Sequence, residues 1–321
     1  MSDTRVTEND AIVYATDIHL TDRQPVNRVA PVSLGLTVFR NLLDLTKERK
    51  AALVLGGDLF DTPNPSYDLL SQVIFILTSY KEVPVYMCRG NHDVNYANMD
   101  KACGISVLEQ TGLITFLEDG VFVNGFFISA YDYEPRLPYV RSADDKKWNL
   151  EVLPEPPAEV MTDITTIMVA HLPIVTKHVP YDHIYAYDIQ TDADYVLCGH
   201  IHERFSTVIN STSPSGDGKA YLINPGCLFR LKRNEKDIKP SALLIERIGG
   251  KTVHSFIPVP GDPDPQFIME DPKDTVTFNT AVADAKIEVS DVEAYIHASS
   301  YPKVVQDKAI ELIKEKEGLN D

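Results

Sequence analysis

The sequence predicts an α/β chain in four layers, with two packed β-sheets flanked by helices on both outer sides. The first half alternates short apolar runs with longer segments of helical periodicity, an order typical of parallel strands joined by helices. The second half carries apolar runs without such helices between them, which favours a second sheet packed on the first. At 321 residues, the chain can form one large domain and a small appendage.

The first half is expected to hold three strands and two helices. The strands are the apolar runs AIVYAT (11–16), AALVL (51–55) and VPVYMC (83–88). The helices are residues 33–50 and 65–80, whose length and spacing suit a helix with one buried face. This order implies parallel strands with right-handed crossovers, so ligands are expected at the carboxyl edge of the sheet.

The second half is richer in expected strands. They cover residues 121–130, 165–170, 194–198, 219–224 and 241–248. Two long connections, 134–159 and 172–191, lack clear periodicity, which is typical of functional or partner-binding loops.

A domain boundary is predicted near residue 260. The stretch IPVPGDPDP (257–265) carries four prolines and a glycine, and it separates a domain of residues 1–260 from a segment of residues 261–321. Within that segment, PKVVQDKAIELIKEKEG carries one apolar stripe at helical spacing. The stripe predicts a small helical appendage that packs on the main domain or binds a partner.

Composition and charge narrow the class of protein. No apolar run approaches the roughly 20 residues that span a bilayer, and the polar N-terminal stretch shows no signal peptide. We therefore expect no membrane association and a cytoplasmic location, the host cytoplasm if the chain is phage-encoded. The four cysteines lack CxxC spacing, which favours reduced, buried thiols. A net charge of −17 argues against a general nucleic-acid coat protein, but not against a nuclease that engages phosphate through metals.

Five expected strand ends each carry aspartate, asparagine or histidine. The stretches are DIH (17–19), GGDLFD (56–61), GNHD (90–93), AH (170–171) and CGHIH (198–202). Each stretch alone is common, and a single histidine at a strand end is more often a surface or core residue than a ligand. Their joint occurrence gives seven candidate metal ligands: Asp17, His19, Asp58, Asn91, His171, His200 and His202.

These residue types indicate a centre with two metal ions. Carboxylate, imidazole and amide ligands suit hard to borderline divalent ions, and there is no thiolate set to select structural zinc. Seven candidates are too many for one ion. Two ions that share a bridging carboxylate would use them all, and such a pair clamps phosphate and activates water.

The five motifs, in this order from about residue 11 to 205, resemble the calcineurin-like metallophosphoesterase superfamily. The resemblance implies the β-sandwich of that superfamily, with Asp58 as the bridge between its two ions. It assigns two sets of ligands: Asp17, His19, Asp58 and His202 for one ion, and Asp58, Asn91, His171 and His200 for the other.

The resemblance also assigns the remaining polar residues of these motifs. It implies that His92 reaches the scissile phosphate, where it stabilises the transition state or protonates the leaving oxygen. A histidine in that role needs an orienting partner, and Asp61 occupies the position of that partner. Asp93 would then cap or brace the turn.

Flanking residues narrow the resemblance further. GDLFDTPNPS, CGHIHER and INPGCLFRLKR are similar to the SbcD branch, the nuclease subunits of double-strand-break repair complexes, including short versions carried by bacteriophages. This implies a two-metal DNA nuclease that hydrolyses phosphodiesters with metal-activated water. Manganese is the expected ion, and magnesium, iron and zinc are alternatives. The implied partners are DNA, a second copy of the chain, and an SbcC-type ABC ATPase bound through the C-terminal region.

Three basic residues are candidates for DNA binding. Arg230, Lys232 and Arg233 follow an expected strand and the NPG turn, where they could meet backbone phosphates. A solvated basic patch explains them equally well. The stretch LLSQVIFIL (69–77) is apolar over a wide face, which fits a dimer contact or burial against the sheet.

Two other functions fit the same motifs. A phosphatase or small-molecule phosphodiesterase would use the same centre, because fold and metals set the chemistry and not the substrate. The acidic net charge favours that function, and the flanking motifs and helical tail favour the nuclease. A DNA-tethering scaffold subunit of an ATPase complex is the third, but it would not need every ligand intact.

Overall fold

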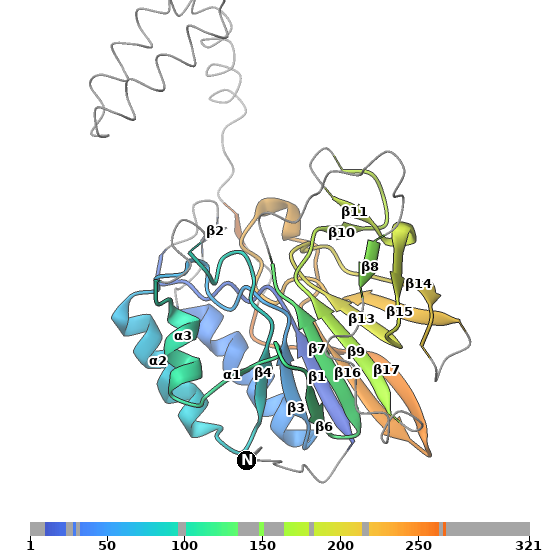
Figure 1. Ribbon diagram of the computed structural model, residues 1–321. Helices are drawn as coiled ribbons and strands as arrows, with labels where there is room; N and C mark the ends of the chain where they lie inside the picture. Colours follow the sequence, from blue (N-terminus) through green and yellow to red (C-terminus); the bar gives the residue numbers. More distant parts are fainter. Residues whose placement is uncertain are drawn as a thin grey trace, which may run out of the picture. The chain divides into compact units, whose positions relative to one another are not determined.

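The computed structural model describes residues 10–23, 28–29, 33–95, 101–133, 148–150, 164–179, 183–213, 218–262 and 266–267. These residues form two large β-sheets and three α-helices (Figure 1). The helices are α1 (Ser33–Glu48), α2 (Tyr67–Ser79) and α3 (Gly104–Gln110). None of the helices in these ranges has the length and apolar character needed to cross a membrane.

The first sheet has six strands in the order β17-β16-β1-β3-β4-β5. Their bounds are β1 Ala11–Ala15, β3 Ala52–Leu55, β4 Val85–Met87, β5 Thr115–Phe116, β16 Ser241–Ile248 and β17 Lys251–Pro258. Strands β1, β3, β4 and β5 are parallel neighbours, and one helix stands between each consecutive pair in the chain. The predicted β-α-β-α-β order is therefore confirmed, and β16 joins the sheet antiparallel to β1.

The second sheet has eight strands in the order β6-β7-β9-β13-β15-β14-β12-β8. Their bounds are β6 Val121–Val123, β7 Phe126–Tyr131, β8 Trp148–Leu150, β9 Thr165–Ala170, β12 Ile189–Thr191, β13 Tyr195–Cys198, β14 Phe205–Ser211 and β15 Lys219–Asn224. Strands β7, β9, β13 and β15 run parallel to one another. Their carboxyl ends therefore share one edge of this sheet, as those of β1, β3 and β4 share one edge of the first.

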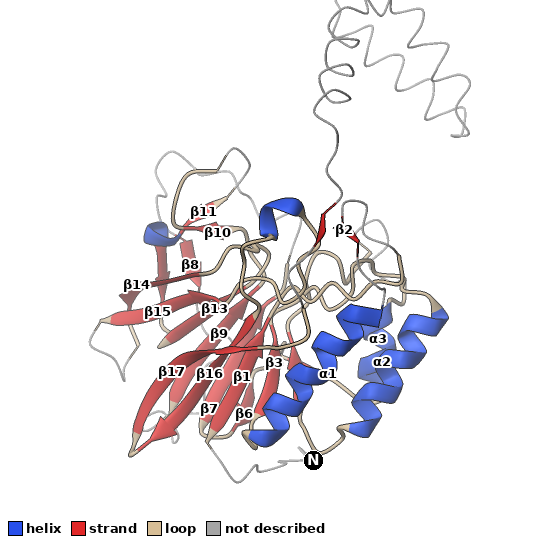
Figure 2. Ribbon diagram, turned by 180° about the vertical axis from the view of Figure 1, so that it is seen from behind, coloured by secondary structure: helices blue, strands red, loops and turns tan. Residues whose placement is uncertain are grey.

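Alternating side chains give each sheet two buried faces. On β1, Val13 packs with the core under the helices, whereas Ile12 packs with residues of the second sheet such as Ile128 and Val169. This alternation is the period of two that a strand imposes. The helices lie together against the outer face of the first sheet (Figure 2). The predicted α/β fold with two packed sheets is confirmed.

The outer face of the second sheet is covered by the predicted connection 172–191. Within it lie β10 (Ile174–Val175), β11 (Ile184–Tyr185) and the 3₁₀ turn η1 (Ala186–Asp188). Their apolar side chains pack on the outward residues of β9 and β13. The layer here is thus short strands and a turn in the described residues, where the sequence suggested helices. Of the other connection, 134–159, only β8 is described.

The expected strand 121–130 is in fact a hairpin. Asn124 and Gly125 both have positive φ, 52° and 78°, and they join β6 to β7 as a two-residue turn. Asn-Gly is the dipeptide that such a turn favours, because both residues tolerate the left-handed region. The sequence carried this signal, and the continuous apolar character of VFVNGFFISA concealed it.

Two further predictions concern the cysteines and the C-terminal segment. All four cysteines are free and buried, as their spacing indicated. Of the predicted segment 261–321, only Gly261, Asp262 and β18 (Gln266–Phe267) are described, and β18 pairs with β2 (Arg28–Val29). The predicted helical appendage lies outside the described residues.

Candidate metal centre

The loops that follow five parallel strands meet at one site. They follow β1, β3 and β4 of the first sheet and β9 and β13 of the second. Backbone hydrogen bonds tie them together, since Asp17 N–H donates to the Gly57 carbonyl and His19 N–H donates to the Asp58 carbonyl. The structure thereby brings together the seven candidate ligands, which are Asp17, His19, Asp58, Asn91, His171, His200 and His202.

Four of these candidates have a strained backbone. Their φ angles lie between 49° and 75°, in the left-handed region that residues other than glycine rarely adopt. The four are Asp17, His19, Asp58 and His200. Only two other non-glycine residues in the described part of the chain have such φ angles, Lys50 and Asn124. Such strain costs of order 1 kcal/mol per residue and persists where the surrounding contacts fix the conformation. The backbone strain is therefore concentrated at this one site, which is typical of a functional centre.

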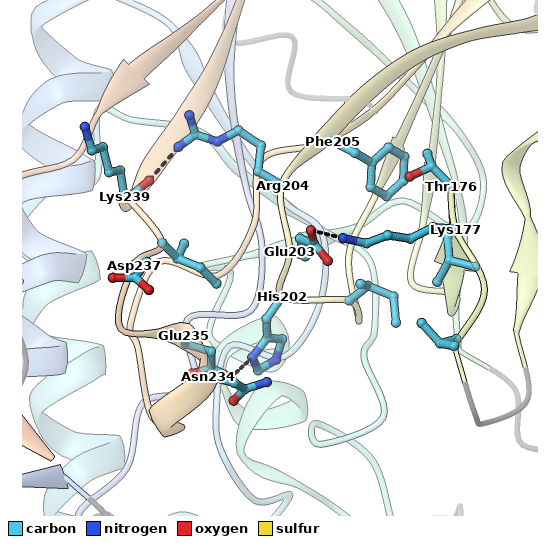
Figure 3. Close-up of a pocket in the computed structure, with 14 residues that line it drawn as sticks. Thr176, Lys177, His202, Glu203, Arg204, Phe205, Asn234, Glu235, Asp237 and Lys239 are labelled. Carbon is cyan, nitrogen blue, oxygen red and sulfur yellow. Dashed lines mark hydrogen bonds and ion pairs between the residues drawn. The ribbon is translucent and has the colours of Figure 1, made fainter.

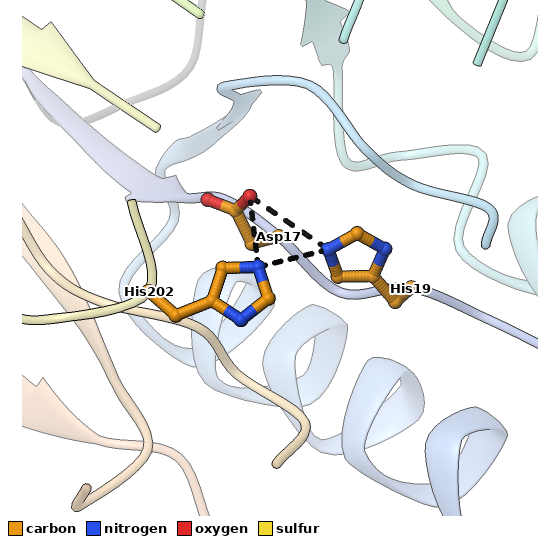
Figure 4. A group of neighbouring side chains, drawn as sticks. All are labelled: Asp17, His19 and His202. Atoms are coloured by element: carbon orange, nitrogen blue, oxygen red, sulfur yellow. Dashed lines mark hydrogen bonds and ion pairs between the residues drawn. The ribbon is translucent and has the colours of Figure 1, made fainter. Parts of the chain in front are cut away.

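The first group of ligands is built around Asp17. The Nε2 atoms of His19 and His202 lie 3.2 Å apart, and Asp17 Oδ1 lies 3.8 and 3.6 Å from them (Figure 4). Asp58 Oδ2 lies 3.7 Å from His19 Nε2. Ligand atoms that surround one ion at about 2.0–2.2 Å lie roughly 3–4 Å from one another. This group therefore has the spacing that one divalent ion requires.

The second group shares Asp58 with the first. Asp58 Oδ2 lies 3.3 Å from His171 Nε2. Asn91 Oδ1 lies 3.1 Å from His171 Nε2 and 2.7 Å from His200 Nδ1. One carboxylate oxygen thus faces both groups, which is the position that a ligand bridging two ions would take.

The charges at this site also suit cations. Asp17, His19, Asp58 and His171 are all buried. In the described residues, Asp17 and Asp58 form their ion pairs with the histidines His19, His171 and His202. Burial lowers the pKa of His171, but Asp58 raises it overall, to about 10. Buried charges need a partner or a metal. Two divalent ions would replace the protons by which these histidines pair with Asp17 and Asp58.

His92 contacts Asp61 in a way that the sequence did not predict. His92 Nδ1 donates to the backbone carbonyl of Asp61 at 2.9 Å, whereas the Asp61 carboxylate is 3.8 Å away. That carboxylate is slightly closer to His19 Nδ1, at 3.5 Å. His92 and Asp61 are thus adjacent, as expected. The group that accepts the orienting hydrogen bond of His92 is the Asp61 backbone carbonyl and not its carboxylate. The His92 ring is 41% exposed, so it is open to a substrate.

Asp93 braces two loops. Its buried carboxylate accepts hydrogen bonds from the backbone N–H groups of Gly90, Asp58 and Phe60, at 3.0, 2.7 and 3.2 Å. Burial and the nearby Asp58 carboxylate raise the pKa of Asp93 to about 8, although these N–H donors oppose the shift. Asp93 therefore holds the loops that carry Asp58 and Asn91 against each other, the bracing role expected from the sequence.

The three basic residues proposed for DNA contact are not equivalent. Arg230 is 4% exposed, and its guanidinium donates to Asp262 at 2.8 Å and to the carbonyls of Lys236 and Ile238. The prediction of a phosphate contact is corrected for Arg230, because its donors are used inside the fold. Lys232 is exposed and lines the cavity at the centre. The side chain of Arg233 lies outside the described residues.

Two residues at the site were not identified from the sequence. Tyr133 stacks on His200, with ring centroids 5.6 Å apart and planes at 26°. It stands just after β7, so the rule that strand ends build the site could have found it. Glu235, in the 3₁₀ turn η2 (Arg233–Glu235), contacts His202 Nδ1 at 2.5 Å. No spacing or motif in the sequence connects these two residues.

Two cavities adjoin at the centre. One of about 330 Å³ is lined by candidate ligands, including His19, Asp58 and Asn91. The other, of about 770 Å³, lies beside it, with Lys177, Arg204 and Lys239 among its lining residues (Figure 3). They share the lining residues Ile201, His202, Asn234 and Glu235. A substrate held at the metals would therefore have room to extend to this side.

Gly90 offers a test of how tightly the loops pack. A Cβ there would overlap the Asp58 backbone nitrogen and Oδ1, which cannot move without disturbing the centre. We expect Gly90→Ala to lower the free energy of unfolding by about 3 kcal/mol. Gly112→Ala is the control, because no described atom lies within 4 Å of such a Cβ at Gly112; its φ of 69° adds only the backbone strain of the left-handed region, so we expect about 1 kcal/mol. Equal losses in chemical denaturation would contradict the packing argument.

Comparison with known proteins identifies the family. A family model described as calcineurin-like phosphoesterase matches residues 11–204. No curated protein matches the chain.

Three solved structures are similar to the chain. A purple acid phosphatase from yellow lupin is 13% identical, with a TM-score of 0.47, and the match covers 85% of this chain and 56% of that one. Vacuolar Protein Sorting 29 from Cryptosporidium parvum is 14% identical, with a TM-score of 0.32 and coverages of 78% and 97%. The nuclease MPE from Pseudomonas putida is 16% identical, with a TM-score of 0.32 and coverages of 68% and 75%.

The chain spans little more than half the length of the lupin phosphatase. The family match, by contrast, extends over more than half of this chain and includes all five loops of the candidate centre. The chain therefore belongs to the calcineurin-like phosphoesterase family, whose members hydrolyse phosphoesters at a dinuclear metal centre.

Proposed function

We propose that this chain is a two-metal DNA nuclease, the nuclease subunit of an SbcCD-like repair complex. The observation that carries the proposal is the position of INPGCLFRLKR (223–233), the segment that resembles SbcD-type nucleases. Its Cys227 N–H donates to the His202 carbonyl at 3.2 Å, and Leu228 N–H donates to the Asp17 carbonyl at 3.4 Å. Lys232, near its end, lines the cavity of the centre. The segment thus lies against the ligands, where it can help select the substrate.

The space beside the centre supports a substrate larger than a simple phosphate monoester. Pockets of roughly 300–1,000 Å³ hold most small ligands and cofactors. The cavity of about 770 Å³ can accept a nucleoside attached to a phosphate held at the smaller cavity. Apolar side chains such as Val175 and Phe205 offer contacts for a base, and Lys239 adds positive charge, whereas Lys177 is ion-paired with Glu203.

His92 is proposed to protonate the leaving oxygen. The carbonyl of Asp61 can only accept, so Nδ1 of His92 carries a proton and points the rest of the ring away from Asp61. A second proton on Nε2 gives an imidazolium that can donate to the departing sugar oxygen, and the Asp61 carboxylate 3.8 Å away stabilises that charge. Two divalent ions, manganese by expectation, would when bound polarise the phosphate and lower the pKa of water.

The proposal is tested by supplying several phosphoesters to the metal-loaded protein. Labelled duplex and single-stranded DNA are incubated with Mn²⁺, beside a cyclic dinucleotide and p-nitrophenyl phosphate. We expect cleavage of DNA that stops when EDTA removes the metal. Rapid monoester hydrolysis without DNA cleavage would instead support the phosphatase. The net charge of −17 favours that alternative, since it repels a polyanion.

Two protein partners belong to the proposal. A second copy of the chain is one, and the outward face of α2 supports it because Tyr67 and Phe75 are 93% and 70% exposed. An SbcC-type ABC ATPase is the other, bound by residues 261–321. Light scattering that finds only monomers at micromolar concentration would exclude the dimer. Failure of the full chain to bind such an ATPase in a pull-down would exclude the complex.

A further inference from the structure

We infer that Glu235 is a positioning residue for one of the two metal ions and that it acts through His202. His202 uses its two ring nitrogens in different directions. Nε2 faces Asp17 and His19 in the first ligand group, while Nδ1 lies 2.5 Å from Glu235 Oε1. A carboxylate at Nδ1 keeps the proton on that nitrogen, which leaves the lone pair of Nε2 directed at the ion. This inference rests on the metal centre of the proposed function.

The carboxylate of Glu235 is itself held in place. Its Oε2 atom accepts the backbone N–H groups of Leu231 and Lys232, both at 2.7 Å. Its own N–H donates to the Lys232 carbonyl at 3.0 Å, within the turn that contains η2. Glu235 is 2% exposed. Both oxygens therefore have fixed partners, and the side chain cannot swing away to solvent without breaking several hydrogen bonds.

Among the candidate histidine ligands in the described residues, only His202 has a carboxylate hydrogen-bonded to the ring nitrogen that faces away from its ligand group. His171 Nδ1 is held by the Gly56 carbonyl at 2.7 Å, which is a neutral partner. His19 Nδ1 lies 3.5 Å from Asp61 and makes no hydrogen bond in the described residues. His200 points its Nδ1 toward Asn91 in the second group. Glu235 thus adds a full negative charge behind one ligand of the first group, which makes that imidazole a stronger donor to a cation.

The same residues could be read as a separate ion site, because His202, Cys227 and Glu235 lie close together. Two observations oppose this. Glu235 Oε2 is already taken by two N–H groups. Cys227 is fully buried, and burial raises the pKa of its thiol, so the thiolate that binds a metal is disfavoured. The positioning role accounts for every contact of Glu235 without a third ion.

Glu235→Gln is the discriminating variant. If its amide oxygen faces His202, its NH₂ group meets the N–H groups of Leu231 and Lys232, and donor faces donor. If its NH₂ group faces His202 instead, it donates to Nδ1 and moves the ring proton to Nε2, which then cannot bind a metal. Either arrangement weakens His202 as a ligand while the size of the side chain stays the same.

The test measures metal binding directly, with isothermal titration of Mn²⁺ into the full-length apo-protein. We expect two ions on the wild type, and a 10- to 100-fold weaker affinity for one of them in Glu235→Gln, with the other changed less than threefold. Asp237→Asn is the matched control, since Asp237 is an exposed acid of the same loop, and it should bind both ions normally. Electron paramagnetic resonance should show the signal of a coupled manganese pair in Glu235→Gln only at excess Mn²⁺.

The outcomes separate this inference from the metal centre itself. The thermal midpoint of apo Glu235→Gln is compared with that of the apo wild type. If the midpoint of Glu235→Gln is lower by more than a few degrees, Glu235→Asp, which keeps the negative charge, is tested in its place. Glu235→Asp should recover most of the lost Mn²⁺ affinity. Two ions bound normally by a folded Glu235→Gln protein would overturn the positioning role alone. A third ion on the wild type that Cys227→Ser removes would also overturn it. A wild type that binds no Mn²⁺ would overturn the metal centre and this role together.

Discussion

Asp58→Asn should bind at most one Mn²⁺ tightly and lose at least about 10³-fold in kcat, equivalent to roughly 4 kcal/mol of transition-state stabilisation. Asp58 Oδ2 lies 3.3 Å from His171 Nε2 and 3.7 Å from His19 Nε2, so it is the atom that faces both ligand groups. Asparagine keeps the shape and one oxygen but removes the charge that a bridging ligand supplies. The measurement is Mn²⁺ titration by calorimetry together with kcat on the best phosphodiester.

Thermal unfolding gives a second measurement of the same prediction. At 100 times its dissociation constant, a metal that binds only the folded state stabilises it by about 2.7 kcal/mol. For a domain of this size, that raises the midpoint by about 5–10 °C. We expect this increase in the wild type and in the control Asp22→Asn, which changes an exposed aspartate after β1. In Asp58→Asn the increase should be less than half as large. An Asp58→Asn protein that retains both ions and full turnover would refute the bridging assignment.

His92→Gln should show the opposite pattern, with both ions retained and kcat reduced by about 10²- to 10⁴-fold. The ring of His92 is partly exposed and makes its hydrogen bond to the Asp61 carbonyl. The contact of His92 with Asp58 is through its backbone N–H, at 2.7 Å from Oδ1, and a glutamine preserves it. Calorimetry for the metal and steady-state kinetics for turnover separate the two effects.

Asp61→Asn is the companion to this variant. The backbone carbonyl that holds His92 remains, and only the carboxylate 3.8 Å away loses its charge. Because both groups are partly exposed, that charge is worth about 1 kcal/mol, so we expect a loss of about fivefold in kcat. If His92→Gln released a metal ion, His92 would be a ligand and not the acid. If Asp61→Asn were as damaging as His92→Gln, the carboxylate and not the carbonyl would be the orienting group.

Local patterns in the sequence were sufficient for the two packed sheets, for the helices on the first sheet and for the candidate ligands, but not for the layer that covers the second sheet. Apolar runs such as AIVYAT and helical spacing at 33–50 reflect burial of one or both faces, which the chain encodes over a few residues. The parallel order of the first strands then implied that Asp17, Asp58 and Asn91 share a sheet edge, and they do. The hairpin at Asn124–Gly125 was missed because hydrophobicity outweighed a turn signal that the sequence did contain.

Only the tertiary structure decided which groups touch which. It turned the Asp61 carbonyl toward His92, buried Arg230 against Asp262, and placed Glu235 behind His202. None of these contacts follows from periodicity, because each depends on the path of a loop and on which donors remain to be satisfied once the sheets have packed. The sequence by itself thus determined the fold class and the types of ligand at the metal centre. The packing of the loops decided their orientation, since hydrogen-bond geometry depends on distances of a few tenths of an ångström that no short pattern specifies.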